Sequence, residues 1–225
     1  LHFKVVLPEF SKIKNVVETL LIDGIPLILA ITLHEAAHAY AAKRLGDFTA
    51  FYLGRVSLNP IKHIDPVGTL LIPIVLKLIG SPILFGYAKP VPVNFLALNH
   101  PKRDMIWVAL AGPASNWIQA VLWTLLLSIL LATANAQDLL ISMAKAGIYW
   151  NVILAVLNLF PLPPFDGGRI LVRLLPMEQA RFVSKIEPFG FFILLGLALS
   201  GLLSDIWMEP LIKLSLEVLE LFMFQ

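Results

Sequence analysis

Long apolar segments separated by shorter polar stretches dominate this chain. The apolar segments cover residues 24–45, 66–87, 105–133, 139–160 and 189–207. Runs of about 20 apolar residues are long enough to cross a bilayer as helices. The pattern therefore predicts an all-α polytopic membrane protein.

The second apolar segment, residues 66–87, differs from the others. Pro73, Lys77 and Pro82 interrupt it, and a proline breaks the hydrogen-bond ladder of a helix. Irregular backbone at membrane depth is tolerated only where protein or water surrounds it. We therefore expect a re-entrant segment with no net crossing, and a bundle of about four spanning helices from the remaining segments.

Two further stretches complete the predicted architecture. Residues 46–65 alternate between apolar and polar positions and contain Gly and Asn-Pro, which predicts a short membrane-associated β-hairpin. Residues 208–225 carry charges at helical spacing on an apolar stretch, which predicts a helix lying in the interface. We expect one intramembrane domain over 1–225, with its core at about 24–176 and the last span and interfacial helix at 189–225.

The composition supports a membrane location. Of the 225 residues, 58% are hydrophobic and 14% are charged, whereas soluble domains are nearer half apolar and a quarter charged. The net charge of +2 is too small to indicate a nucleic-acid partner. The chain contains no cysteine, so any metal must be bound by His, Asp or Glu.

Titratable residues occur inside the first apolar segment, in the stretch "ITLHEAAHAYAAKRLG". His34, Glu35 and His38 form the pattern H-E-x-x-H. On a helix, positions i and i+4 lie on one face, so two imidazoles can share a metal while the glutamate reaches a bound water. The alternative is a pair of interfacial histidines with a snorkelling glutamate. Each ionisable group at membrane depth costs about 2.5–3.5 kcal/mol, and a bound dication would compensate for this cost.

A catalytic zinc site needs a third protein ligand, and Asp166 is the best candidate. It follows "NLFPLPPF" and precedes Gly167 and Gly168. The prolines end the preceding helix, and the glycines allow the backbone to approach closely around the carboxylate. The alternative is that Asp166 caps a helix starting near Arg169, and the spacing alone leaves both interpretations open.

Three stretches in the same order resemble the site-2 protease family of intramembrane zinc metalloproteases. They are "HEAAH" at 34–38, "AGPASN" at 111–116 and "NLFPLPPFDGG" at 158–168. The resemblance implies that His34, His38 and Asp166 bind Zn²⁺, that Glu35 is the catalytic base, and that Asn158 contacts the substrate backbone. It covers about residues 24–176 and is greatest for small members without a PDZ or nucleotide-sensing domain.

We therefore expect an intramembrane zinc endopeptidase that hydrolyses peptide bonds in or near transmembrane segments, with a metal-activated water and Glu35 as general base. Asn158 or Asn116 would stabilise the oxyanion, although Asn116 is equally explained as a polar residue in helix packing. The alternative is a non-hydrolytic metal-binding membrane protein, such as a transporter or an inactive scaffold. A transporter would be expected to show paired repeats, and none is visible.

Basic residues predict the orientation in the membrane. Lys43 and Arg44 follow His38, and Arg169 follows Asp166, so both ligand groups lie toward a basic face, which is the cytoplasmic face. This places Lys43, Arg44, Arg55, Lys62, Lys89, Lys102, Arg103, Arg169, Arg173, Arg181 and Lys185 inside, and Lys4, Lys12, Lys14 and Lys145 outside. We expect a multi-pass protein of the cell (inner) membrane, with the N-terminus outside and the active site toward the cytoplasm. The expected partners are a transmembrane protein substrate and the lipid bilayer, and a homo-oligomer is left open.

Overall fold

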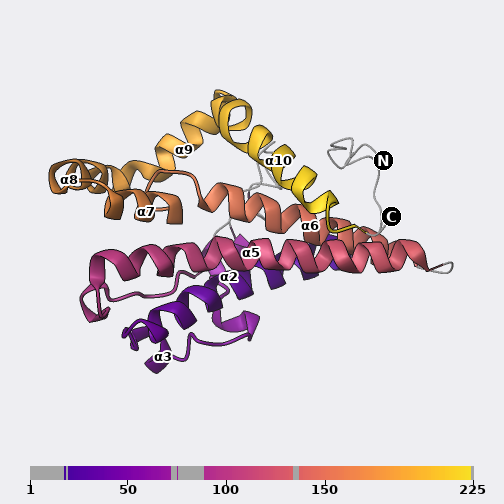
Figure 1. Cartoon of the computed structure of the whole chain (residues 1–225), viewed down its shortest axis with the longest axis horizontal. Coiled ribbons are helices and arrows are strands. Elements are labelled where there is room, and N and C mark those ends of the chain that lie inside the picture. Colours follow the sequence, from indigo (N-terminus) through magenta and orange to yellow (C-terminus); the bar gives the residue numbers. More distant parts are fainter. Residues whose placement is uncertain (1–17, 19, 72–74, 76–88, 134–136, 224–225) are drawn as a thin grey trace. The chain divides into compact units, whose positions relative to one another are not determined.

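The structure is a computed structural model, and it describes residues 18, 20–71, 75, 89–133 and 137–223 (Figure 1). Its helices are α2 (Ile25–Arg44), α3 (Thr49–Tyr52), α5 (Pro101–Ala132), α6 (Asp138–Asn158), α7 (Asp166–Leu174), α8 (Met177–Ile186), α9 (Gly190–Leu199) and α10 (Glu209–Glu220). Short 3₁₀ turns occur at Pro60–Lys62, Phe95–Ala97 and Glu187–Phe189, and wider π-helical turns at Leu20–Gly24, Pro66–Leu71 and Ser204–Met208. None of the described residues is in a strand.

Four helical segments of the described chain are long and apolar enough to cross a membrane. They are Leu21–Arg44, Pro101–Ala132, Asp138–Asn158 and Met177–Leu199. This confirms the prediction of about four spanning helices. The predicted re-entrant segment, residues 66–87, falls largely outside the described residues.

The last span begins and ends earlier than predicted. The sequence places it at 189–207, whereas the apolar helical segment of the structure is Met177–Leu199. Gly201 has a φ of 80°, a left-handed conformation that commonly ends a helix. Residues that the apolar pattern assigned to one span are therefore divided between α9 and the turn Ser204–Met208.

The predicted β-hairpin over residues 46–65 is wrong, because local polar contacts determine this stretch. The Asp47 carboxylate accepts a hydrogen bond from the backbone N–H of Thr49 at 2.9 Å, which opens the short helix α3. Gly54 then adopts a φ of 66°. Asn59 accepts from Ile61 N at 3.1 Å and begins a 3₁₀ turn. Asp and Asn compete with strand pairing in this way, so alternation alone misled the prediction.

The described chain divides into two compact units. One contains Leu1–Ala30, Asn116–Leu157 and Phe192–Gln225, and the other contains Ile31–Ser115 and Asn158–Phe191. We call them the first and second unit. The prediction of a single domain over 1–225 stays a prediction.

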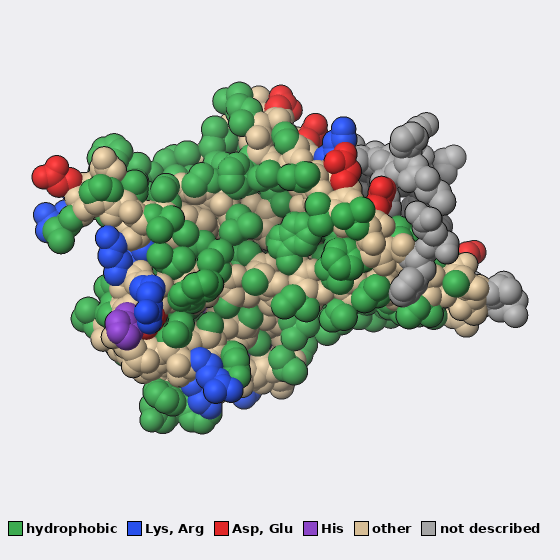
Figure 2. Space-filling view, viewed as in Figure 1, with side chains coloured by type: hydrophobic (Ala, Val, Ile, Leu, Met, Phe, Trp, Pro, Cys, Tyr) green, Lys and Arg blue, Asp and Glu red, His purple; other side chains and the backbone are tan. Residues whose placement is uncertain are grey.

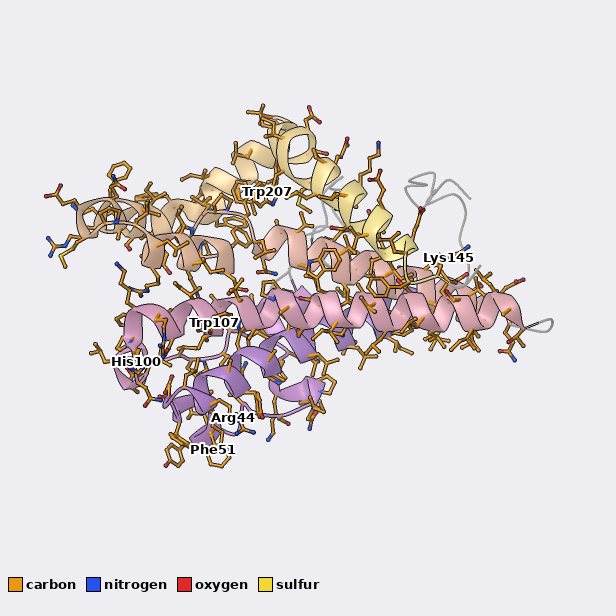
Figure 3. The ribbon with its side chains drawn as sticks, viewed as in Figure 1. Arg44, Phe51, His100, Trp107, Lys145 and Trp207 are labelled. Atoms are coloured by element: carbon orange, nitrogen blue, oxygen red, sulfur yellow. The ribbon has the colours of Figure 1, made fainter. Side chains whose placement is uncertain are left out.

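The first unit has a core in which α10 packs along α6 and α5 (Figure 1). Leu127 of α5, Val152 of α6 and Leu219 of α10 are buried in one cluster. Trp207, labelled in Figure 3, donates its indole N–H to the carbonyl of Val156 at 2.8 Å. The C-terminal helix is therefore attached to this unit by apolar packing, and the turn Ser204–Met208 before it by a partly buried hydrogen bond.

The second unit is built around the alanine-rich face of α2. Ala39 and Ala42 are fully buried, which allows other backbone segments to approach closely. Ala42 packs with Leu98 and Val108 near the start of α5, and Ala39 packs with Val91. Lys and Arg side chains gather on this unit, over α3 and the first turns of α5 (Figure 2).

Candidate metal site

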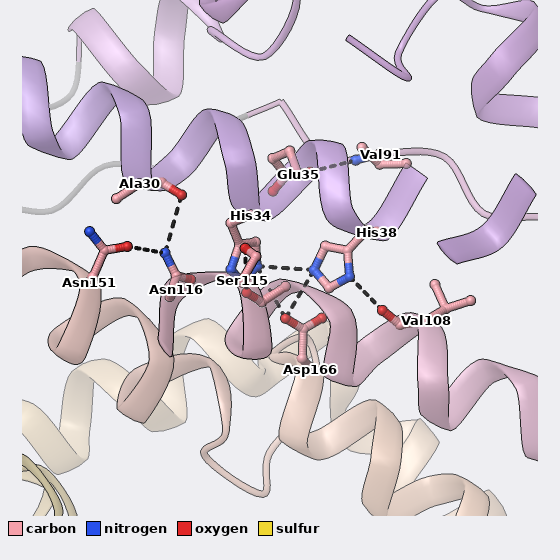
Figure 4. A network of polar contacts seen from close by, with 11 residues as sticks. Ala30, His34, Glu35, His38, Val91, Val108, Ser115, Asn116, Asn151 and Asp166 are labelled. Atoms are coloured by element: carbon pink, nitrogen blue, oxygen red, sulfur yellow. Dashed lines mark hydrogen bonds and ion pairs between the residues drawn. The ribbon is translucent and has the colours of Figure 1, made fainter. Parts of the chain in front are cut away.

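Helix α2 presents the two histidines of the H-E-x-x-H pattern on one face, as the i, i+4 spacing requires. The Nε2 atoms of His34 and His38 lie 3.0 Å apart (Figure 4). The two side chains are 6% and 7% exposed. Two buried imidazoles with their ring nitrogens at this separation need a shared cation or shared protons between them.

Asp166 supplies a carboxylate to the same point. Its Oδ2 atom lies 3.3 Å from Nε2 of His34 and 3.1 Å from Nε2 of His38, and the residue is 4% exposed. The three residues form a group that could hold a metal ion, with all ligand atoms within 4.8 Å of one another. All three belong to the second unit.

Two glycines bring Asp166 to this place. A Cβ on Gly167 would lie 2.1 Å from the carbonyl oxygen of Leu159, and a Cβ on Gly168 would lie 2.1 Å from the nitrogen of Pro163. The preceding loop therefore folds directly against the start of α7, and only glycine leaves room for it. The N-cap of α7 is Phe165, and no side chain caps the helix, so Asp166 does not act as the cap.

The donor set fits a divalent metal such as zinc. With zinc–ligand distances of about 2.0–2.1 Å, tetrahedral geometry separates two ligand atoms by about 3.3–3.4 Å, close to the separations of the three ligand atoms. His38 Nδ1 lies 2.7 Å from the carbonyl oxygen of Val108, which assigns the N–H to Nδ1. In a neutral ring, Nε2 then presents a lone pair toward Asp166, which matches the usual orientation of metal-binding histidines.

The electrostatics point in the same direction. Burial by itself raises the pKa of the Asp166 carboxyl, but the positive charge and hydrogen bonds of protonated His38 and His34 hold this pKa well below its usual range. Without a metal, protons on the imidazoles must compensate the buried carboxylate. A divalent cation supplies the same compensation while both imidazoles stay neutral.

Gly112, within "AGPASN" on α5, packs against both imidazoles. A Cβ at this position would lie 2.4 Å from Nε2 of His38 and 2.6 Å from Nε2 of His34. The bare backbone of α5 therefore forms one wall of the site. Sequence analysis singled out the "AGPASN" stretch, but it named Asn116 as the candidate residue and did not consider Gly112.

Glu35, the proposed general base, is held by a loop residue. Its Oε2 accepts a hydrogen bond from the backbone N–H of Val91 at 2.9 Å (Figure 4). Sequence reasoning missed both Val91 and Val108, because each acts through its backbone. Every residue type has a backbone carbonyl, and every type except proline has a backbone N–H, so the side chain gives no signal.

The two predicted asparagines lie in different units. Asn116 is fully buried in the first unit, where its amide nitrogen donates to the carbonyl of Ala30 at 3.2 Å and to Oδ1 of Asn151 at 2.9 Å. Asn151 in turn donates to the carbonyl of Gly147 at 2.9 Å. Asn158 is the last residue of α6, belongs to the second unit and is half-buried.

Comparisons with known proteins agree with this chemistry. A sequence profile described as "Peptidase family M50" matches residues 126–199. "Putative zinc metalloprotease YwhC" of Bacillus subtilis (strain 168) is 39% identical over 185 residues, which are 79% of this chain and 80% of that protein. "Putative zinc metalloprotease Rip2" of Mycolicibacterium smegmatis is 30% identical over 186 residues, which are 81% of this chain and 68% of that protein. No solved structure matches the chain.

Proposed function

Because the chain belongs to peptidase family M50, the site-2 protease family, we propose that it is a zinc endopeptidase that cuts membrane proteins in or near their transmembrane segments. Four helices of the described chain are apolar enough to cross a membrane, so the protein is a multi-pass membrane protein. The observation that carries the proposal is that the His34, His38 and Asp166 side chains converge on one point. The two histidines, with Glu35 next to His34 in the chain, belong to the apolar helical segment Leu21–Arg44.

In this proposal His34, His38 and Asp166 bind zinc, which when bound lowers the pKa of water and polarises a carbonyl group. Glu35 accepts the proton of the attacking water and transfers it to the leaving amide nitrogen. The hydrogen bond from Val91 orients the Glu35 carboxylate, so that the base does not need to be ordered when the substrate arrives.

We assign the role of oxyanion donor to Asn158 rather than Asn116. Both amide hydrogens of Asn116 are directed at acceptors, the carbonyl of Ala30 and Oδ1 of Asn151. Asn158 ends α6 in the unit that also contains the candidate ligands. A donor placed where negative charge develops typically contributes about 10²–10³ in rate.

The proposed orientation places the active site toward the cytoplasm of the cell (inner) membrane and the N-terminus outside. Its support is that every Lys and Arg assigned above to the inner side belongs to the second unit, which also contains the candidate metal site. Basic segments are retained on the cytoplasmic side. A single cysteine introduced between 90 and 100 should react with a membrane-impermeant reagent only after the membrane is opened. Labelling in intact cells would contradict the orientation.

The central experiment is Glu35→Gln. Glutamine keeps an oxygen that can accept from Val91 N–H but cannot take up a proton, so zinc content should be unchanged while cleavage falls by about 10²–10⁴. Glu178→Gln is the matched control, because Glu178 is an exposed glutamate of the same unit. A transporter or scaffold would keep its function in Glu35→Gln, so full cleavage or unchanged metal-dependent function would overturn the proposed mechanism.

A further inference from the structure

A buried arginine lies outside the metal site, and its direct contacts are with a backbone carbonyl and an imidazole. Arg55 is 6% exposed. Its Nη2 donates to the carbonyl of Lys89 at 2.5 Å and lies 3.5 Å from Nδ1 of His63, while its Nε is buried without a hydrogen-bond partner among the described residues. No carboxylate of the described chain forms an ion pair with it. A buried cation that no carboxylate contacts directly is costly, so an anionic ligand would complete the site.

The partners of Arg55 hold it in one orientation. His63 is 1% exposed, and its Nε2 donates to the carbonyl of Ser57 at 2.8 Å. This assigns Nδ1 as the acceptor that faces the guanidinium. The carbonyl of His63 accepts from the backbone N–H of Lys89 at 3.0 Å. The guanidinium is therefore preorganised and need not be ordered when a ligand binds, which lowers the entropic cost of binding.

Arg55 lines a hollow of about 280 Å³. The remaining lining residues are Leu53, Lys89, Pro90 and Pro92. Among the described residues, the lining thus combines two cationic residues with three apolar ones and contains no acid. Proline has no backbone N–H, so Pro90 and Pro92 present apolar rings there and no backbone donors. This chemistry suits a ligand with a short aliphatic stem and an anionic end.

The hollow also adjoins the proposed general base. Pro90 and Pro92 flank Val91, and the N–H of Val91 is the group that donates to Glu35. Burial lowers the pKa of Arg55, and the negative charge of Glu35 opposes this lowering. When a substrate peptide bond lies beside Glu35, the substrate side chains next to that bond would therefore lie near this hollow.

We propose that the hollow formed by Arg55, Lys89, Pro90 and Pro92 is a specificity subsite that binds an acidic side chain of the peptide substrate near the cleaved bond. This inference rests on the proposed protease function. A glutamate fits best, because its methylene groups would contact the prolines while its carboxylate reaches the two cations. Charge-assisted hydrogen bonds of this kind are about twice as strong as neutral ones. The headgroup of an anionic phospholipid is the competing ligand.

The test uses the full chain in vesicles of phosphatidylcholine. The probes are single-span peptides that carry one Glu, moved residue by residue along one end of the span, each with a Gln twin. Binding is measured to the Glu35→Gln chain, and cleavage is measured with the wild-type chain. Lys89→Glu reverses one charge of the hollow, and it leaves intact the backbone groups of residue 89 that bond His63 and Arg55. Lys102→Glu is the matched control, an exposed lysine of the same unit that does not line the hollow.

At one position the Glu peptide should bind about tenfold more tightly than its Gln twin, as expected for a charge-assisted hydrogen bond. Lys89→Glu should abolish this preference, and Lys102→Glu should retain it. Equal binding of the twins at every position would overturn the subsite. So would a preference that disappears when phosphatidylglycerol is added, because its net anionic headgroup would then be the occupant.

The two measurements separate the subsite from the protease. A Glu preference in binding without any cleavage would leave the subsite standing and refute the proposed function. Cleavage of both twins at equal rates, with equal binding, would refute the subsite and leave the proposed function intact.

Discussion

Replacing Gly112 with alanine is expected to remove bound zinc from a chain that remains folded. The added Cβ would lie 2.4 Å from Nε2 of His38 and 2.6 Å from Nε2 of His34. Gly112 lies inside α5 directly before Pro113, so the helix gain of about 1 kcal/mol that alanine usually brings is opposed by crowding between the new Cβ and Cδ of the proline. We therefore expect little net change in helix stability, and the main effect of the substitution is on the ligand geometry.

The size of the effect follows from these distances. Ordinary van der Waals contact begins at about 3.4 Å, so one or both imidazoles must retreat by about 0.8–1.0 Å. Metal–ligand distances tolerate only about 0.2 Å. At least one histidine therefore leaves coordination range. Loss of a residue that only hydrogen-bonds to a metal ligand typically lowers metal affinity by about 10–100-fold. Displacing a ligand itself should lower zinc affinity by more than this.

The assay is zinc competition with a chelator on the purified protein, with circular dichroism to check that the helices remain. Gly196→Ala is the matched control, because a Cβ on this glycine meets nothing within 4 Å. Gly196→Ala should bind zinc like the wild type. Wild-type zinc affinity in Gly112→Ala would refute the reasoning, since it would mean that the imidazoles do not meet at the point facing Gly112.

Two further substitutions test separate parts of the structure. Asp166→Ala should abolish stoichiometric zinc in metal analysis, because two imidazoles alone do not complete the site. The control Asp138→Ala, at an exposed aspartate, should retain zinc. Stoichiometric zinc in Asp166→Ala would exclude this carboxylate as a ligand. Asn151→Ala removes one acceptor of the Asn116 amide. It should lower the free energy of unfolding, measured by denaturation in mixed micelles, by about 0.6–1.7 kcal/mol. Zinc content should be unchanged. The exposed Thr133→Ala should have little effect on the same measurement, and an equal loss there would show that the buried amide network is not the cause.

The candidate third ligand, Asp166, shows how far sequence reasoning reached. His34 and His38 share a face because of helix periodicity alone, so their pairing could be read locally. Asp166 could be named as a candidate, but spacing left a helix cap as an equal alternative. Packing of the loop against Gly167 and Gly168 removed this alternative, since it brings the carboxylate within 3.3 Å of both imidazoles.

The residues that surround the site show the opposite case. Val91 and Val108 contribute only backbone groups, so no pattern of side chains could reveal them. Arg55 appeared in the sequence as one of many basic residues. Only folding placed it in the interior beside His63, at 6% exposure. The hairpin prediction failed for a related reason, since Asp47 and Asn59 made local turns that alternation does not encode.

The sequence by itself determined three of the four described spans, the pair of histidines with its glutamate, and the requirement for a non-thiolate ligand set, because these depend on composition and on contacts one helical turn apart. The tertiary structure decided which carboxylate joins the histidines, which backbone groups orient them, and which cation is buried beside the proposed base. These features depend on contacts between residues far apart in the chain, and such contacts are set by packing and not by local periodicity.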